Sequence, residues 1–212
     1  YRLDEELAQF LNYLYAQIAP EEVVVVLTSD HGTSPSYDAG IVERDRFNAA
    51  QFQVIVNSFL CAQHGPGEWV VDYEDNNLYL NHTLIYNKGL DLAAIQNEAA
   101  TFAMQFRGVS HALSSTAMRS SYFGSGYPRR SGDVVVNLMP GCIEERPDVR
   151  SKSGSMYGYD TTVPLVLYGG GIPARRVGRS VDMTSVAPTL AYLLDIPEPA
   201  ASEGTVLEEF RK

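Results

Sequence analysis

The feature of the sequence best suited to chemistry is an aspartate next to a histidine, Asp30 and His31, shortly after the β-branched run at residues 23–27. A carboxylate oxygen and an imidazole nitrogen together suit zinc and related divalent ions. Gly32 follows, and a glycine lets the backbone turn sharply enough for neighbouring side chains to face one ion. The structural alternative is a helix-capping aspartate followed by a surface histidine. Asp30 and His31 are therefore candidate metal ligands.

The elements around this pair indicate an α/β protein. Apolar residues recur at helical spacing in residues 2–18, which predicts an amphipathic helix. The runs at 23–27 and 163–168 suit strands that are covered on both faces. In open α/β sheets, ligands bind at the carboxyl ends of the strands, which is where Asp30 and His31 fall. We expect both runs to be interior strands.

The rest of the sequence continues this alternation with one interruption. The alternation breaks in the middle of the chain, so we expect a small α+β insertion at about 61–132 beside the main sheet. From Pro197 onward the sequence predicts an irregular tail. The other expected helices are 45–64, 91–106 (capped by Asp91) and 183–194 (with Pro188 in its first turn). The other expected strands are 69–73 and 78–81, with a hairpin turn at 74–77 between them, 109–113 and 134–136.

Composition narrows the class of protein. The 212 residues are 45% hydrophobic and 20% charged, the balance of a folded soluble protein, and we treat residues 1–212 as part of one domain. The formal net charge of −10 disfavours nucleic acid as a partner, because nothing attracts a polyanion. No apolar run approaches the roughly 20 residues that span a bilayer. We therefore expect no membrane segment.

The ends and the cysteines leave further expectations. The chain begins at Tyr1, inside a helical pattern, which favours a fragment whose leader would lie elsewhere. Cys61 and Cys142 are the two cysteines, and neither has metal-ligand spacing. They could form a disulfide in an oxidising compartment or remain buried thiols.

Several motifs together resemble a known family. In their order and spacing they are similar to the bacterial phosphate-irrepressible alkaline phosphatase branch of the alkaline phosphatase superfamily, and the resemblance covers nearly the whole chain. It implies an alkaline-phosphatase-like fold, with a mostly parallel sheet and helices on both faces, in the C-terminal part of such a protein. The motifs lie at residues 1–4, 28–32, 78–81, 130–135, 154–165 and 180–190.

The resemblance also implies the chemistry. Members use a threonine nucleophile between two metal ions, normally zinc, although other divalent ions are possible. Asp30 and His31 match the pair that binds the nucleophile's metal. The nucleophile and the remaining ligands of that ion lie upstream in the family, so this chain is expected to hold no catalytic nucleophile.

At one position the chain departs from the family pattern. Ser153 stands where members carry a histidine that binds the other metal, and Thr162 replaces a second histidine. A neutral hydroxyl is a far poorer zinc ligand than imidazole. Ser153 is therefore a degenerate ligand position. His64, His82 and His111 could replace it only in principle, and each fits an ordinary surface or capping histidine better.

The favoured interpretation is a metal-dependent hydrolase of small-molecule phosphate monoesters. By resemblance it would be periplasmic or otherwise exported, and this chain alone would be inactive without the remainder of its parent chain. One alternative is a non-catalytic phosphatase-like binding protein, which Ser153 and Thr162 motivate. Others are a phosphodiesterase or sulfatase of the same superfamily and a structural α/β module without metal.

Overall fold

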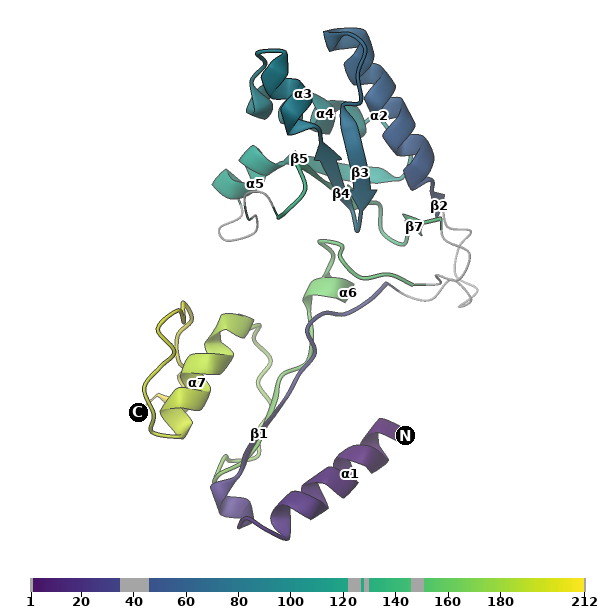
Figure 1. Cartoon of the computed structure of the whole chain (residues 1–212). Coiled ribbons are helices and arrows are strands. Elements are labelled where there is room, and N and C mark those ends of the chain that lie inside the picture. Colours follow the sequence, from purple (N-terminus) through teal and green to yellow (C-terminus); the bar gives the residue numbers. More distant parts are fainter. Residues whose placement is uncertain (1, 35–45, 122–126, 128–129, 146–150, 212) are drawn as a thin grey trace. The chain divides into compact units, whose positions relative to one another are not determined.

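The computed structural model describes residues 2–34, 46–121, 127, 130–145 and 151–211 (Figure 1). The chain divides into two compact units, one of Tyr1–Thr28 with Pro164–Lys212 and one of Ser29–Val163. In the described ranges, no helix is long and apolar enough to cross a membrane. The two units are described separately below.

The first unit is built on two strands far apart in sequence. β1 (Val24–Leu27) pairs antiparallel with β8 (Val166–Gly169), with Val24 opposite Gly169. Gly169 has φ 92°, and a Cβ there would lie 2.1 Å from the Val23 carbonyl oxygen. This close approach of two backbones requires glycine.

The expectation that these two runs are interior strands of a parallel sheet is wrong for the pairing inside this chain. Among the described strands, β1 pairs only with β8, and the pairing is antiparallel. Leu27, Val166 and Tyr168 are about half exposed. A β-branched run favours a strand, but the direction and number of its neighbours depend on which segments lie alongside it.

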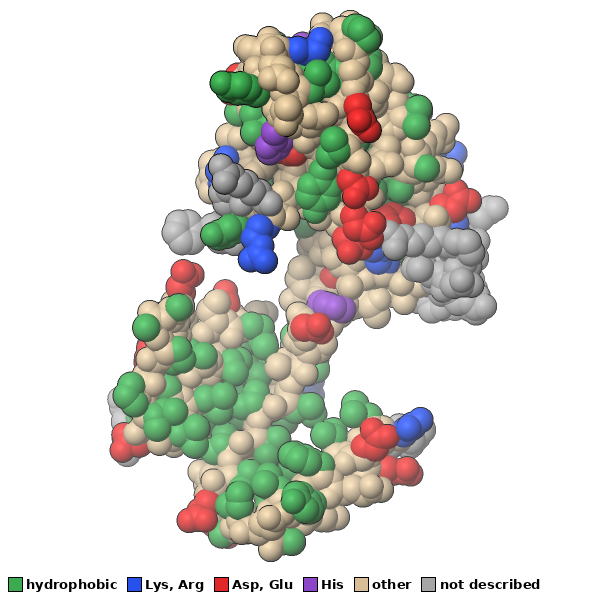
Figure 2. Space-filling view, viewed as in Figure 1, with side chains coloured by type: hydrophobic (Ala, Val, Ile, Leu, Met, Phe, Trp, Pro, Cys, Tyr) green, Lys and Arg blue, Asp and Glu red, His purple; other side chains and the backbone are tan. Residues whose placement is uncertain are grey.

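The helix α1 (Arg2–Tyr15) has the expected amphipathic pattern, yet none of its residues is buried. Leu3 and Phe10 are 67% and 58% exposed. The helix ends before the expected residue 18, ahead of a short 3₁₀ helix at Pro20–Glu22. Figure 2 shows hydrophobic side chains along α1 and around the C-terminal helix α7 (Val186–Leu193) on the surface of this unit.

The C-terminal helix and its tail pack together. α7 (Val186–Leu193) follows a 3₁₀ turn at Met183–Ser185, and Pro188 lies in its first turn as expected. The buried Thr189 hydroxyl accepts a hydrogen bond of 2.9 Å from the backbone N–H of Leu207. The tail beyond Pro197 is irregular, as expected, apart from a 3₁₀ turn at Glu208–Phe210. Hydrogen bonds and the buried Leu207 dock it onto α7.

The second unit contains a four-stranded antiparallel sheet in the order β3-β4-β6-β5. Asp75 and Asn76 have φ values of 46° and 63° and join β3 to β4. A two-residue hairpin loop with both φ values positive matches the right-handed twist of its strands, and the expected turn is confirmed. The strands are β3 (Val70–Glu74), β4 (Asn77–Leu80), β5 (Val109–Ser114) and β6 (Val134–Leu138).

Helices cover this sheet and complete its core. The two long ones are α2 (Ala49–His64) and α4 (Leu92–Ala103), and Asp91 caps the second as expected. The contiguous apolar core lies between Phe47 and Leu138, with Trp69 fully buried. The structure adds elements that periodicity did not predict: α3 (His82–Asn87), α5 (Ser115–Ser121), and the parallel pair β2 (Arg46–Phe47) and β7 (Ile143–Glu144).

The helix expected at 45–64 therefore begins at Ala49. Residue 45 lies outside the described residues, Arg46 and Phe47 form β2, and the Asn48 side chain caps the helix by accepting from the Gln51 N–H. The boundaries of the expected insertion, at about 61–132, stay a prediction. The antiparallel sheet extends past the second boundary into β6, and α2 crosses the first.

Glu209 generates a prediction about the tail. Its two carboxylate oxygens accept hydrogen bonds from Arg179, which hold its pKa below the ordinary value. The contribution of the Arg179–Glu209 pair to the docking of the tail is therefore complete above the ordinary pKa of a glutamate. It is lost as the pH falls through the lowered pKa of Glu209. We expect Glu209→Gln to increase amide hydrogen exchange at Leu207 near pH 7. In wild type, protection of this amide should fall in acid, and in Glu209→Gln this pH dependence should disappear.

Glu208→Gln is the matched control, because Glu208 lies 4.0 Å from the Arg179 Nε and is 76% exposed. The two variants remove the same charge from neighbouring positions. Equal exchange at Leu207 in both would contradict the assigned role of the Arg179–Glu209 pair.

Candidate metal site

The carboxylate of Asp30 is held from one side. Its Oδ1 accepts hydrogen bonds from the His31 backbone N–H at 2.9 Å and from the Ser29 hydroxyl at 3.3 Å. Its Oδ2 lies 3.5 Å from the His31 Nε2, and both side chains are exposed. One oxygen thus orients the carboxylate, while the other faces the imidazole.

The His31 ring is oriented by the next residue. Its Nδ1 lies 2.7 Å from the Gly32 carbonyl oxygen. Because a carbonyl can only accept, Nδ1 donates the proton, and in the neutral ring Nε2 keeps its lone pair. Histidines that bind metals commonly donate their other N–H to a carbonyl or carboxylate in this way. The structure therefore presents Nε2 beside the Asp30 Oδ2.

The distance between these two atoms fits adjacent ligands on one zinc ion. Zinc binds nitrogen and oxygen at about 2.0–2.1 Å in tetrahedral geometry, which places neighbouring donor atoms about 3.3–3.4 Å apart. The observed separation of 3.5 Å is close to that value. The separation of the two donor atoms is therefore compatible with two ligands of one zinc ion.

The charge of Asp30 is also suitable. The His31 backbone N–H, followed by the His31 side chain, lowers the pKa of the Asp30 carboxyl from its ordinary value. Asp30 therefore remains an anion at neutral pH and is ready to bind a cation.

A third protein ligand is not brought to this pair. In the part of the chain that the structure describes, no three histidine, cysteine, aspartate or glutamate side chains gather so that they could hold a metal ion. A catalytic zinc normally has three protein ligands. The described residues therefore supply only part of such a site.

The other histidines have polar partners of their own. The His64 Nε2 lies 2.6 Å from Glu98, and the His111 ring lies 2.8 Å from the Ser110 hydroxyl. His82 contacts Asp133 at 2.8 Å, and that buried carboxylate also accepts from Gln96 and the Leu80 N–H. This carboxylate joins α3 and α4 to the sheet.

The Asp30–His31 pair is anchored by the segment at 152–160. The Gly32 N–H donates to the Asp160 carbonyl at 2.8 Å, and Ser34 and Lys152 exchange two hydrogen bonds of 3.0 Å. A Cβ on Gly32 would lie 2.0 Å from the Tyr159 carbonyl oxygen. The approach is possible only because residue 32 has no side chain. Asp160 belongs to the short helix α6 (Gly158–Thr161).

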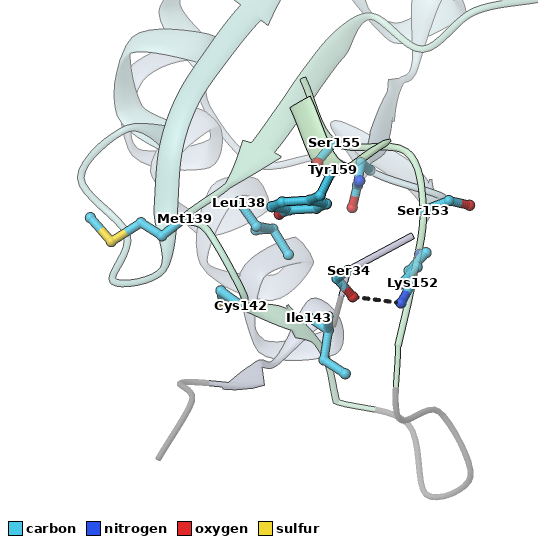
Figure 3. A pocket seen from close by; sticks show the side chains of 10 residues that line it. Ser34, Leu138, Met139, Cys142, Ile143, Lys152, Ser153, Ser155 and Tyr159 are labelled. Carbon is cyan, nitrogen blue, oxygen red and sulfur yellow. Dashed lines mark hydrogen bonds between the residues drawn. The ribbon is translucent and has the colours of Figure 1, made fainter. Parts of the chain in front are cut away.

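Ser153 follows Lys152 at the edge of a small pocket that both polar and apolar side chains line (Figure 3). The volume of the pocket, about 20 Å³, suits a water molecule rather than a substrate. Lys152 Nζ contacts the buried Glu144 carboxylate at 2.8 Å and Asp75 at 3.2 Å. The structure thus brings the segment of Ser153 alongside that of His31, while its status as a former ligand position stays a prediction. Thr162 ends α6.

The cysteines are not joined by a disulfide in the structure. Cys61 and Cys142 are both partly buried. The Cys61 Sγ donates to the Gly67 carbonyl at 3.1 Å. Of the two open alternatives, the structure therefore supports thiols.

Sequence reasoning missed Gly32 as a packing constraint and missed Asp160 altogether. Asp160 is 4% exposed, and its Oδ2 accepts from the Ser155 N–H at 2.7 Å. The available signal was a charged residue in the otherwise uncharged stretch from Ser153 to Tyr168. Only the fold shows that this residue lies against Gly32.

Three known proteins align with nearly all of this chain, while no family model matches it. Alkaline phosphatase PafA of Elizabethkingia meningoseptica is 24% identical over 225 residues, which cover 98% of this chain and 40% of PafA. Alkaline phosphatase PhoV of Synechococcus elongatus is 25% identical over 233 residues, or 100% of this chain and 40% of PhoV. A protein of Myroides odoratus named calcium-transporting ATPase is 25% identical over 221 residues, with coverage of 98% and 40%.

The structural comparison defines the fold as an α/β fold of the alkaline phosphatase type. The crystal structure of wild-type PafA matches with a TM-score of 0.84 and 24% identity, covering 98% of this chain and 42% of that chain. The α/β class and the resemblance to alkaline phosphatases are confirmed. The chain spans about 40% of the length of the relatives it matches.

Gly32 generates a prediction about the site. We expect Gly32→Ala to break the backbone hydrogen bond to Asp160, because the new methyl group would overlap the Tyr159 carbonyl. Overpacking of this kind typically destabilises by about 1–3 kcal/mol. Denaturant unfolding measures the loss, and amide exchange at residue 32 should show the broken hydrogen bond.

Gly158→Ala is the control, because the one neighbour of its added Cβ within 4 Å is the Thr162 Oγ1 at 3.9 Å. This variant should leave stability and exchange at residue 32 nearly unchanged. If Gly32→Ala were as stable as wild type, the described approach of the two segments would be wrong.

Proposed function

We propose that this chain is part of a zinc-dependent hydrolase of phosphate monoesters, in which Asp30 and His31 bind one of the metal ions. The observation that carries the proposal is the 3.5 Å separation between Asp30 Oδ2 and His31 Nε2, with the other polar atom of each side chain already hydrogen-bonded. Two oriented donors at a ligand-to-ligand distance are what a metal site needs.

Each residue of the site has a defined task in this proposal. Asp30 provides an anionic oxygen, and His31 provides the Nε2 lone pair. The Gly32 carbonyl accepts a hydrogen bond from the Nδ1–H and keeps the ring in the tautomer that can bind a metal. When bound, zinc would supply Lewis-acid stabilisation of the reacting phosphoryl group and lower the pKa of a hydroxyl nucleophile. We assign no nucleophile to this chain.

The likeness to alkaline phosphatases supports the substrate class. Two of the relatives bear the name alkaline phosphatase, and the name of the third, an ATPase, also denotes hydrolysis at a phosphoryl group. We therefore propose small phosphate esters as substrates and a periplasmic or otherwise exported location. The substrate class and the location are proposed for the whole protein, because this chain spans about 40% of the length of its relatives.

The second candidate is a binding protein that has lost a metal site. Ser153 and Thr162, where the family pattern has histidines, favour it. In that case the Asp30–His31 pair would bind a metal or ligand without turnover.

The first experiment measures hydrolysis of p-nitrophenyl phosphate with added zinc. We expect no turnover above background from the 212-residue chain, because it has two assigned ligands and no assigned nucleophile. The whole protein should turn over the substrate and lose that activity in Asp30→Ala. If the whole protein keeps its activity in Asp30→Ala, the proposal is contradicted. If neither the wild-type whole protein nor its Asp30→Ala variant is active, the binding protein is favoured.

The second experiment tests Ser153 by calorimetric zinc titration of the whole protein. We expect Ser153→His to tighten zinc binding by about tenfold or more, because imidazole replaces a weak neutral oxygen ligand. Ser151→His introduces the same group at a nearby exposed residue and should have no effect. Equal affinities in all three proteins would mean that residue 153 does not face the metal site.

A further inference from the structure

One oxygen of the Asp160 carboxylate accepts a hydrogen bond within its own turn, and the other accepts none from the described residues. Asp160 is 4% exposed, and its Oδ2 accepts from the Ser155 N–H at 2.7 Å. Its Oδ1 is buried and has no hydrogen-bond partner among the residues that the structure describes. An unsatisfied buried carboxylate oxygen is unfavourable, and such groups in native proteins often mark functional positions. The Asp160 carboxylate thus holds the Ser155 N–H at the start of the 155–160 turn, together with backbone hydrogen bonds from the Asp160 and Thr161 N–H groups to the Tyr157 carbonyl.

The backbone of Asp160 connects this turn to the candidate metal site. Its carbonyl accepts from the Gly32 N–H at 2.8 Å, and the Gly32 carbonyl accepts from the His31 Nδ1 at 2.7 Å. The Gly32 carbonyl lies between two hydrogen bonds to the same segment, because the Ser34 N–H also donates to the Lys152 carbonyl at 3.0 Å. The position of the 152–160 segment therefore restricts where the Gly32 carbonyl lies, and that carbonyl accepts the hydrogen bond that favours the Nδ1–H tautomer of His31.

We propose that Asp160 is a positioning residue for His31. By bonding the Ser155 N–H it holds the turn against Gly32, so that the His31 proton stays on Nδ1 and the Nε2 lone pair stays beside the Asp30 Oδ2. The inference rests on the proposed function and deepens it, because a metal ion needs the Nε2 lone pair in a fixed position. Outer partners of this kind typically change metal affinity by about 10- to 100-fold.

The test reads the His31 tautomer directly by long-range ¹H–¹⁵N NMR of the metal-free 212-residue chain. In wild type we expect the Nδ1–H form. In Asp160→Ala the turn loses its bond to Ser155, and we expect a shift toward the Nε2–H form. In Asp160→Asn the side-chain carbonyl can still accept from the Ser155 N–H, and we expect the wild-type tautomer. If Asp160→Ala does not fold, Asp160→Glu, whose carboxylate is displaced by one methylene, takes its place.

Asp133→Asn is the matched control for a general loss of stability. Asp133 is also a buried carboxylate of the same compact unit, and its hydrogen bonds to Leu80, Gln96 and His82 lie apart from residues 29–34 and 152–160. This variant should leave the His31 tautomer unchanged. An unchanged tautomer in Asp160→Ala, an equal shift in Asp133→Asn, or equal shifts in Asp160→Ala and Asp160→Asn would each overturn the proposal.

Zinc chloride titration, followed through the same His31 signals, separates the two proposals. We expect Asp160→Ala to raise the zinc Kd about tenfold relative to wild type and Asp160→Asn to restore it. If zinc does not affect His31 in wild type, the metal site proposed for the chain is wrong. The metal-free tautomers still decide whether Asp160 positions His31.

Discussion

The candidate site depends on one close backbone approach, in which the Gly32 N–H meets the Asp160 carbonyl at 2.8 Å. No side chain fits at residue 32, because a Cβ would lie 2.0 Å from the Tyr159 carbonyl. The same residue turns its own carbonyl to the His31 Nδ1. Hydrogen bonds of two peptide groups thus connect the 155–160 turn to an imidazole nitrogen. These bonds are directional, whereas hydrophobic contacts are not.

The site and the core of its unit are stabilised in different ways. The core between Phe47 and Leu138 is apolar and almost fully buried, with Trp69 and Leu78 at 0% exposure. Asp30 and His31 are exposed and are held by hydrogen bonds to neighbouring residues. Burial stabilises the scaffold without specifying a donor geometry, whereas short polar contacts specify the geometry and leave the metal-binding atoms free.

Ser153 is the residue at which the two proposed functions, hydrolase and binding protein, differ. The segment that carries it is tied to the site through Ser34 and Lys152, so a histidine at 153 would fall on a segment already anchored beside the Asp30–His31 pair. If residue 153 is a ligand position, as the family resemblance predicts, serine puts a weak ligand in place of a good one. Both proposed functions, a hydrolase with a modified second metal site and a binding protein without turnover, share Asp30 and His31. Residue 153 is therefore the position that distinguishes them.

The sequence by itself determined the local features: the β-branched strand runs, the turn at residues 74–77, the Asp91 cap, and Asp30 and His31 as candidate ligands. These follow from periodicity and side-chain chemistry within a few neighbouring residues. Only the tertiary structure decided that β1 pairs antiparallel with β8 and that Asp160 lies against Gly32. Both depend on contacts between residues more than a hundred positions apart, which no local pattern encodes because strand direction and close approach are set by the path of the whole chain.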